Sequence, residues 1–369
     1  MIYTKDTVRF GIKVTVASIL LTSCAQNVKD KMCVPEYAQD AELIKLSGDS
    51  IINRAFDELN RPSKSIIAGD SLVFQDIDDE YCYSIVSISG DSIITRIGPR
   101  GEGPGELLGV TRLQTDKDGH VFVYDEAKQT MYHFNSIDDF AISKDSISSI
   151  RFKDMSGGYL YRTATGYIGD NLYGDGHMFT AFDNDGNIRQ SFGSIPDIKT
   201  DRSLNPDFYM AYQVTFAISP DKKHMCAAGA FHDWLAFFDV SGDTPKLIKE
   251  YYTAEPIVNT DGGDENYHLK LTPETINHYF SMAPFNGGVY LNYIGATQDE
   301  MSNGNFSNHI LRYNWDGELE GIYTMPEKIF DMCTTDSGNE LYTIAVRNSE
   351  PFMSYYQISD SRVSEDSVR

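Results

Sequence analysis

The sequence predicts an all-β protein: a six-bladed β-propeller whose blades are four-stranded antiparallel sheets. Two kinds of hairpin recur along the chain at a spacing of roughly 40–60 residues, close to the length of one propeller blade. Short Asp- and Gly-rich turns join the strands, and Asp-Gly pairs supply the positive φ that tight turns need. The first hairpin type occurs at 113–125, 216–229 and 332–345, and the second at 180–192, 237–251 and 312–323.

Each blade is expected from short runs of alternating apolar and polar residues separated by turn residues. We label the strands of a blade a to d from the propeller axis outward. Composition agrees, since Tyr (23) and Phe (20) dominate the aromatic residues and both favour strands. The expected blades cover 66–98, 110–152, 158–193, 212–252 and 277–325, and a sixth unit at 328–359 has only three strands.

The missing strand of the sixth unit is predicted to come from the N-terminal side of the chain. The run AELIKL at 41–46 is strand-like and precedes the first blade. Pairing this run with the C-terminal strands closes the ring, which removes the exposed sheet edges that an open array would leave. The propeller is therefore expected over 41–360, followed by a polar tail at 361–369.

The stretch 96–135 carries the most specific repeat. It begins with a glycine-rich bend, GPRGEGPGE, and continues through a hairpin with a turn at 116–119. A strand ending in Asp125 and an aromatic-rich run, MYHFN, complete it. This order resembles the NHL-type propeller repeat, and similar glycine-rich segments occur in TolB-like six-bladed propeller lipoproteins. The resemblance implies a six-bladed propeller of that family.

The N-terminus resembles a bacterial lipoprotein signal. Lys5, Arg9 and Lys13 precede a mostly apolar run at 14–21, which is too short to span a bilayer as a mature helix. The letters LTSC follow and end at Cys24. They look like a lipobox, in which the cysteine becomes lipid-modified.

We therefore expect residues 1–23 to be a signal peptide, Cys24 to carry the lipid, and 24–40 to be a tether. Several acyl chains on one cysteine give stable anchoring, whereas a single chain gives only marginal binding. The predicted location is the bacterial cell envelope, with the outer membrane favoured and the side of the membrane left open. The alternative is that this run is a buried strand with an unrelated cysteine.

The charge and the other cysteines narrow the function further. A net charge of −23 argues against nucleic acid as a partner, because phosphate recognition starts from a basic patch. Cys33, Cys82, Cys226 and Cys333 are widely spaced and form no C-x-x-C pair, so they favour neither a zinc site nor a redox motif. An envelope location permits disulfides and leaves their pairing open, although we expect buried thiols.

The connections between strands predict which face of the ring binds a ligand. The a–b and c–d turns are short and lie on one side, here called the short-turn face. The b–c and d–a connections are longer and lie on the other side, the long-loop face. Long loops on a rigid scaffold are where function is concentrated. The long connections are 98–109, 193–211, 229–234, 253–277 and 295–308.

Aromatic, imidazole and guanidinium side chains near these loops are the candidate ligand-binding residues. Their grouping suggests a surface for stacking a sugar or a peptide, and the alternative is that they pack the loops onto the ring. Thr272 and Pro273 also predict a short helix at 273–280, with Thr as the cap and Pro at the first helical position. The candidates are Arg112, Tyr209, Tyr212, His232, Trp234, His278 and Tyr279.

Motifs for catalysis and cofactor binding are incomplete. GPRGEGPGE lacks the Gly-Lys-Ser/Thr of a P-loop and precedes a hairpin, whereas a dinucleotide fingerprint precedes a helix. The acidic turn at 183–187 departs from the spacing of an EF-hand loop. We therefore predict no cofactor and no metal site.

The sequence thus favours a monomeric, non-catalytic propeller that binds an envelope protein, a peptide or a glycan and contacts the membrane only through its lipid. The alternative is an envelope enzyme of the lactonase, lyase or glycosidase type with its site at the axial mouth. Six-bladed lactonases hold an axial calcium with inward Asp, Asn and Glu side chains. The expected inner strands here mainly offer Arg112, Gln114, Gln213, Thr215 and Asp331.

Overall fold

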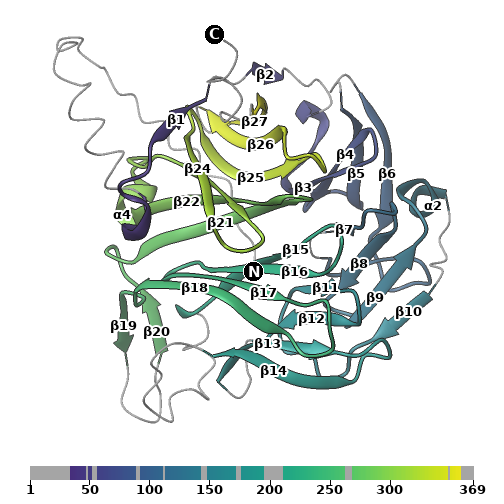
Figure 1. The fold of residues 1–369 in the computed structure, drawn as a ribbon. Helices are drawn as coiled ribbons and strands as arrows, with labels where there is room; N and C mark the ends of the chain where they lie inside the picture. Colours follow the sequence, from purple (N-terminus) through teal and green to yellow (C-terminus); the bar gives the residue numbers. More distant parts are fainter. Residues whose placement is uncertain are drawn as a thin grey trace, which may run out of the picture.

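The computed structural model describes residues 34–46, 49–51, 56–88, 92–110, 113–142, 148–171, 176–194, 211–261, 268–347 and 350–358. Within these residues, six β-sheets surround a central axis as the blades of a propeller (Figure 1). The predicted fold class is confirmed, including the closure of the ring by strands from the N- and C-terminal parts of the chain. Cys24, Arg112, Tyr209 and the predicted tail lie outside the described residues.

The first four blades are each built from four consecutive strands, with the first strand innermost. The first blade contains β3 (Pro62–Ala68), β4 (Ser71–Asp76), β5 (Tyr81–Ser87) and β6 (Ile93–Pro99). The second contains β7 (Gln114–Thr115), β8 (Val121–Asp125), β9 (Thr130–Phe134) and β10 (Ser148–Arg151). The third contains β11 (Leu160–Arg162), β12 (Tyr167–Asp170), β13 (His177–Phe182) and β14 (Ile188–Ser194). The fourth contains β15 (Val214–Ile218), β16 (His224–Gly229), β17 (Asp233–Asp239) and β18 (Lys246–Ala254).

The last two blades also include N-terminal strands. The fifth contains β21 (Ile276–Phe285), β22 (Gly288–Thr297), β23 (His309–Asn314) and β24 (Leu319–Thr324), with β1 (Leu43–Lys45) at its outer edge. The sixth contains β25 (Lys328–Thr334), β26 (Glu340–Arg347), β27 (Glu350–Gln357) and β2 (Asp49–Ile51). A separate hairpin, β19 (Val258–Asp261) and β20 (His268–Leu271), lies between the fourth and fifth blades in sequence.

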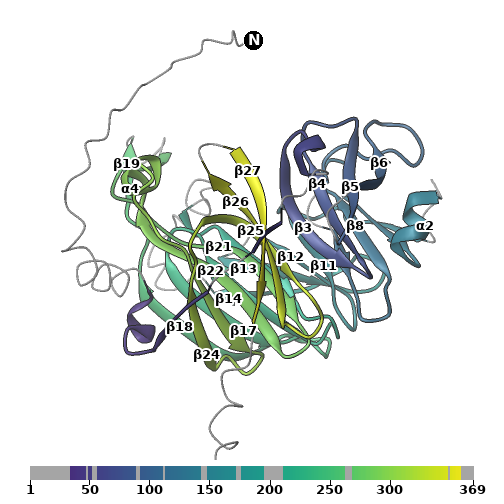
Figure 2. The same cartoon turned by 90° about the horizontal axis from the view of Figure 1, so that it is seen from above.

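The helices with both ends in the described residues are short: η1 (Glu36–Ala38), η2 (Phe56–Glu58), α2 (Ile137–Ile142) and α4 (Gln298–Ser302). In the part of the chain that the structure describes, none has the length and apolar composition needed to cross a membrane. In the side view of Figure 2, α4 and β19 stand above the blades, on the long-loop face. The connection that holds α2 joins strands c and d of the second blade, so the turns of the short-turn face are less uniform than predicted.

Burial follows the position of each strand within its blade. All five residues of β8 are buried, as are six of the seven in β17, because both faces of a middle strand pack against neighbouring blades. The outer strands β14 and β18 have mostly exposed or half-buried residues. The core therefore consists of apolar interfaces between neighbouring blades, here called seams. The outer strands are more polar than the inner and middle strands.

The hairpin turns take the geometry that their Asp and Gly residues predict. In the turn between β7 and β8, Gly119 has a φ of 81°, a conformation that glycine adopts without a steric cost. The carboxylate of Asp116 accepts hydrogen bonds from the backbone N–H groups of Asp118 (2.9 Å) and His120 (3.0 Å). These bonds replace backbone partners that the tight turn cannot provide.

A buried carboxylate ends strand b in each of the first three blades and holds the segment that leads into strand a. Asp76 accepts the N–H groups of Asn60 and Arg61, each at 2.8 Å. Asp125 and Asp170 occupy the same position in the next two blades, and both also accept two successive N–H groups. Burial raises the pKa of Asp170 to about 6, so this carboxyl group is ionised at pH 7 and accepts both bonds.

An N-terminal strand completes the sixth blade, as predicted, but it is a different strand from the one expected. β2 pairs antiparallel with β27, with Ser50 opposite Ser354, and supplies the fourth strand of the sixth blade. The predicted strand at 41–46 instead forms β1, which pairs in parallel with β24 of the fifth blade. Its apolar residues explain the difference: Leu43 packs into the seam between the fourth and fifth blades, and Ile44 into the seam between the fifth and sixth.

Residues just before β1 also pack onto the propeller. Val34 and Ala38 are buried (4% and 2% exposed) against the fourth and fifth blades. The Tyr37 ring stacks on Tyr251 at 4.4 Å between centroids, and the Tyr37 hydroxyl lies 2.5 Å from that of Tyr279. Thus residues 34–40, which the sequence assigned to a tether, are docked, and the earlier part of that segment lies outside the described residues.

The predicted helix at 273–280 is wrong, because the chain turns at 273–274 and β21 begins at Ile276. The Thr275 N–H donates to the Thr272 carbonyl at 3.0 Å, which closes one turn only. From Ile276 onward the backbone pairs with β22, beginning opposite Thr297. Pairing along the length of an inner strand outweighs the local start signal for a helix.

Removal of the N-terminal strands should open the ring. A chain that begins at Phe56 lacks β1 and β2, so the edges of β24 and β27 are unpaired and the seams around Leu43 and Ile44 are exposed. We expect the Tm to fall by more than about 5 °C, since each kcal/mol corresponds to roughly 2–4 °C in a large domain. A chain that begins at Val34 is the control and should melt like the full chain. Equal Tm values for both truncations would contradict closure by these strands.

Replacement of Asp125 by Ala should destabilise the second blade. The change removes the acceptor of the Leu108 and Gly109 N–H groups, and a hydrogen bond to a charged group contributes about 1.5–3 kcal/mol. Urea unfolding should show a loss of about 2–5 kcal/mol in the free energy of unfolding. Asp118→Ala, an exposed change in a nearby turn, is the control and should stay within about 0.5 kcal/mol of the parent.

Candidate functional site

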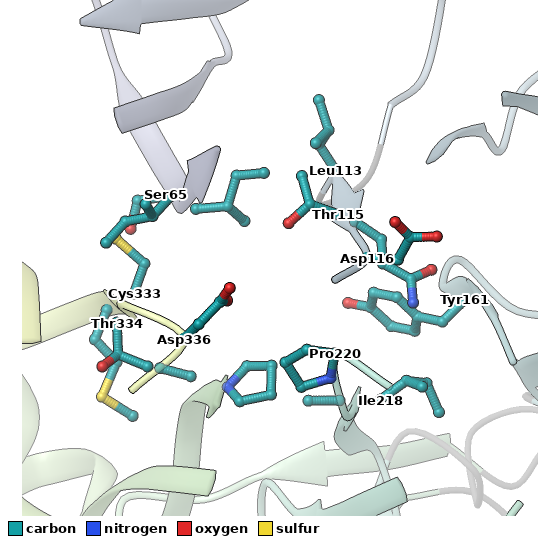
Figure 3. A pocket seen from close by; sticks show the side chains of 17 residues that line it. Ser65, Leu113, Thr115, Asp116, Tyr161, Ile218, Pro220, Cys333, Thr334 and Asp336 are labelled. Carbon is teal, nitrogen blue, oxygen red and sulfur yellow. The ribbon is translucent and has the colours of Figure 1, made fainter. Parts of the chain in front are cut away.

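Two cavities lie along the propeller axis, where the inner strands of the blades surround it. The axial mouth, on the long-loop face, has a volume of about 410 Å³. The axial chamber, toward the short-turn face, has a volume of about 90 Å³ (Figure 3). A small cavity of about 10 Å³ shares Lys64 with the mouth, and it shares Ser65, Ile66 and Leu113 with the chamber. The axis therefore offers two sites of different size and lining.

The axial mouth combines amide, cationic and aromatic side chains. The Asn277 amide donates to the Ala296 carbonyl at 3.3 Å, and the Gln298 amide donates to Asn277 Oδ1 at 3.0 Å, so both are held in place. Gln298 begins α4, whose N-terminus has a Thr297–Glu300 capping box. The complete lining is Lys64, Tyr159, Gln213, Val214, Thr215, Ala230, Phe231, Asn277, Tyr279, Phe280, Gln298 and Met301.

Two aromatic side chains are exposed on inner strands because the strands bulge there. The pairing of β21 with β22 shifts register between Tyr279 and Ser281, and the pairing of β25 with β26 shifts between Ile329 and Asp331. The extra residues are Phe280 and Phe330, which are 40% and 36% exposed. Their rings meet edge to face with centroids 6.1 Å apart. Bulges commonly re-aim a side chain next to a functional site, and Phe280 lines the mouth.

Sequence reasoning missed these two phenylalanines, although one signal was present. In KIFDMCT, the buried positions of β25 include the charged Asp331, while the neighbouring Phe330 is exposed. An acidic residue in an otherwise apolar inner strand indicates an irregular register. The same inversion in β21 places Ser281 inside and Phe280 outside.

Asp331, which the sequence placed on an inner strand, has a structural role at the axis. It is fully buried, and one of its oxygens accepts hydrogen bonds from the Ser65 N–H (2.7 Å) and the Ser65 hydroxyl (2.9 Å). Lys64 Nζ lies 3.8 Å from the other oxygen. These contacts join the inner strands of the first and sixth blades at the axis.

The predicted ligand-binding side chains that the structure describes are buried, so they form no exposed stacking surface. Trp234 is 1% exposed and its indole N–H donates to Glu250 Oε1 at 2.6 Å. Tyr212 and His232 have rings 5.1 Å apart in the seam between the third and fourth blades. Only Tyr279, 2% exposed, borders the axial mouth. The sequence could not show this, because a middle strand is buried on both faces.

His232 and His278 belong to a buried polar cluster between the blades. Burial lowers the pKa of His232 to about 3 and that of His278 to about 4, so both rings are neutral at pH 7. His278 Nδ1 lies 3.9 Å from Asp233 Oδ1 and 3.3 Å from the Tyr293 hydroxyl. Neither nitrogen of His232 has a hydrogen-bond partner among the described residues. The cluster lines neither of the two larger axial cavities, so it stabilises the seam.

In the described ranges, one group of side chains has the spacing of metal ligands: Asp116, Asp118 and His120. The group lies in a turn of the second blade, away from the axial mouth. Asp116 Oδ2 is 2.7 Å from Lys222 Nζ and 3.0 Å from His120 Nδ1. Burial opposes ionisation of Asp116, but hydrogen bonds from Lys222 and His120 hold its pKa below the usual value. The lysine thus already neutralises the best ligand of the group.

The cysteines in the described residues match the expectation of buried thiols. Cys82, Cys226 and Cys333 are buried and form no disulfide. Burial raises the pKa of Cys82 to about 11, so its thiol is protonated at neutral pH and is a poor nucleophile. Cys33 lies outside the described residues.

Comparisons with known proteins agree with the fold. A crystal structure of a DUF4221 family member from Bacteroides vulgatus ATCC 8482 superposes with a TM-score of 0.50 at 12% identity, covering 86% of this chain and 96% of that one. A candidate exported protein from Bacteroides fragilis NCTC 9343 superposes with a TM-score of 0.48 at 10% identity, covering 87% and 95%. No curated protein matches the sequence significantly.

The sequence itself matches one family model, TolB-like 6-blade propeller-like, over residues 47–337. This range begins just before β2, the N-terminal strand that completes the ring, and ends in the hairpin turn after β25. The chain therefore belongs to the TolB-like 6-blade propeller family.

Proposed function

We propose that this protein is a non-catalytic binding module of the bacterial envelope, anchored by a lipid on Cys24, that holds a stretch of glycan or peptide in its axial mouth. The observation that carries the proposal is Phe280, a large apolar side chain that lies at a bulge, is 40% exposed and lines the axial mouth. An exposed phenylalanine on an inner strand loses the burial that the other core aromatics have. A ligand that covers it would restore that burial.

The lining of the mouth suits a ligand with both polar groups and apolar surface. Asn277 and Gln298 present amide groups whose orientation is fixed by hydrogen bonds within the protein. Fixed polar groups beside aromatic surface are the usual composition of a ligand pocket, where the polar groups give specificity and the apolar area gives affinity. Peptides and glycans both carry such groups, so the experiment must distinguish them.

The proposed anchor follows from the lipobox-like residues before Cys24. The docked residues 34–40 support a defined attachment, because a chain leading from the lipid would meet the propeller on the fourth and fifth blades. The net charge of −23 also argues against nucleic acid as a partner.

Phe280→Ala should weaken ligand binding and leave the fold intact. Immobilised glycan and peptide libraries would identify a ligand, and titration would then compare variants. Loss of one aromatic contact, worth roughly 0.5–1.5 kcal/mol beyond area burial, predicts a roughly twofold to tenfold weaker Kd. The matched control is Ile94→Ala, which removes a 57% exposed apolar side chain from the outer strand β6. Equal losses for both variants would contradict a specific site at the mouth.

Trp234→Ala should instead unfold the protein in part. The indole is buried in the seam between the third and fourth blades, and truncation of a buried aromatic side chain costs about 3–5 kcal/mol. The Tm should fall, and any loss of binding should follow the loss of folded protein. A Trp234→Ala variant that keeps the Tm of the parent protein but does not bind the ligand would contradict this prediction and indicate that Trp234 contacts the ligand.

Cys24→Ala should release the protein from the membrane. Cells grown with a palmitate analogue should show label on the parent protein in the membrane fraction, whereas the variant should carry no label and appear in the soluble fraction. Cys33→Ala is the control, since it removes a nearby cysteine that lacks the lipobox context. Label retained on the Cys24 variant, or lost from the Cys33 variant, would contradict the proposed anchor.

A further inference from the structure

The walls of the axial chamber have more apolar than polar surface. Ile66 and Ile67 of β3 are only half-buried because they face this space. Apolar side chains from five of the six inner strands or their ends make up this part of the wall. These wall residues are Ile66, Ile67, Leu113, Ala217, Ile218, Pro220, Ala283, Pro284 and Met332.

Several polar side chains that line the chamber are already occupied within the protein. Ser65 donates to Asp331, and Gln114 exchanges two hydrogen bonds with the backbone of Arg162, at 3.0 and 2.7 Å. The Thr334 hydroxyl donates to the Glu340 carbonyl at 2.7 Å. These groups therefore contribute little hydrogen-bonding capacity toward a ligand.

Asp336 differs from these groups. Asp336 is exposed in the turn after β25. Figure 3 shows its carboxylate directed toward the middle of the axial chamber. Among the described residues, this carboxylate has no hydrogen-bond or ion-pair partner. The other carboxylate of the lining, Asp116, is neutralised by Lys222 Nζ at 2.7 Å. Among the described residues, the chamber lining thus has one carboxylate without a cationic partner, at its rim, and apolar side chains behind it.

We propose that the axial chamber is a second binding site, specific for a small alkyl group with an ammonium group at one end. The apolar group would displace water from the chamber, and the ammonium would remain at the rim beside Asp336. A volume of about 90 Å³ accommodates a short alkyl group such as the side chain of leucine.

The charge of the whole protein supports a cation over an anion. A net charge of −23 raises the local concentration of cations, and a carboxylate at the rim gives that attraction a fixed position. Two sources share this chemistry: a free alkylammonium ion, and the N-terminus of a peptide that begins with leucine. The proposal is independent of the ligand in the axial mouth.

Calorimetric titration of the full chain with n-butylammonium, 1-butanol and butanoate tests the site. We expect binding in the order ammonium, alcohol, carboxylate, with a gap of about threefold to fivefold between the first two, as for a partly exposed ion pair. The gap should shrink in 0.5 M salt, because exposed charge pairs are screened. Equal affinities for the three compounds, or no binding of any, would overturn the proposal.

Variants separate this site from general surface charge and from the mouth. Asp336→Asn should bring butylammonium to within about twofold of butanol and leave butanol binding unchanged. Asp118→Asn, an exposed change on the same face outside the chamber lining, is the matched control. If Asp118→Asn has the same effect as Asp336→Asn, the attraction is not specific to the chamber. Phe280→Ala should leave butylammonium binding unchanged. A wrong proposal for the axial mouth can therefore be distinguished from a wrong proposal for the axial chamber.

A second measurement identifies the source. A tripeptide that begins with leucine should bind with a free N-terminus and not when acetylated, if peptides are the natural ligand. Binding of butylammonium without binding of either peptide assigns the site to free amines. Equal binding of the free and acetylated peptides would contradict a role for the ammonium.

Discussion

The propeller depends on buried carboxylates that hold the chain where it returns from the outer edge of one blade to the axis of the next. The returning backbone is not part of any sheet, so its N–H groups have no partner in a strand ladder. Asp76, Asp125 and Asp170 each accept two successive N–H groups there. One side chain therefore satisfies two backbone groups and sets the position at which the inner strand begins.

Contacts of the same kind continue around the axis. Gln114 pairs with the backbone of Arg162 between the second and third blades. Asn292 and Asn308 contact Ile329 between the fifth and sixth blades, and Asp331 contacts Ser65 between the sixth and the first. Polar side chains thus fix how the blades meet at the axis, while the apolar seams supply most of the buried area. This arrangement keeps the inner strands apart and leaves space along the axis.

The fold could be predicted from the sequence because its signals are local. Strand alternation and Asp-Gly turns locate each hairpin, and their recurrence gives the number of blades. The placement of β1 could not be predicted in this way, because pairing with β24 depends on which seams accept Leu43 and Ile44. The start of β21 was mistaken for a helix because Thr272 and Pro273 give a local signal that sheet pairing overrides.

The candidate site was predictable only in part. The long-loop face does contain the larger axial cavity, but Trp234 and His232 are buried in a seam, since alternation does not reveal a strand that is covered on both faces. Phe280 was missed because a bulge changes which face a residue occupies without any change in composition. The axial chamber is made by one to four residues from each blade, so no continuous motif could indicate it.

The pairing of β2 with β27 has a consequence for biosynthesis. Ser50 and Ser354 are opposite each other, so the outermost strand of the sixth blade is made early and its partner late. At about 5–20 residues per second, synthesis of the intervening chain takes on the order of 15–60 s. Throughout that time the β2 segment has no sheet to join. The ring can therefore close only after the C-terminal strands have been synthesised, and the last blade to form is the one that joins the two ends of the chain.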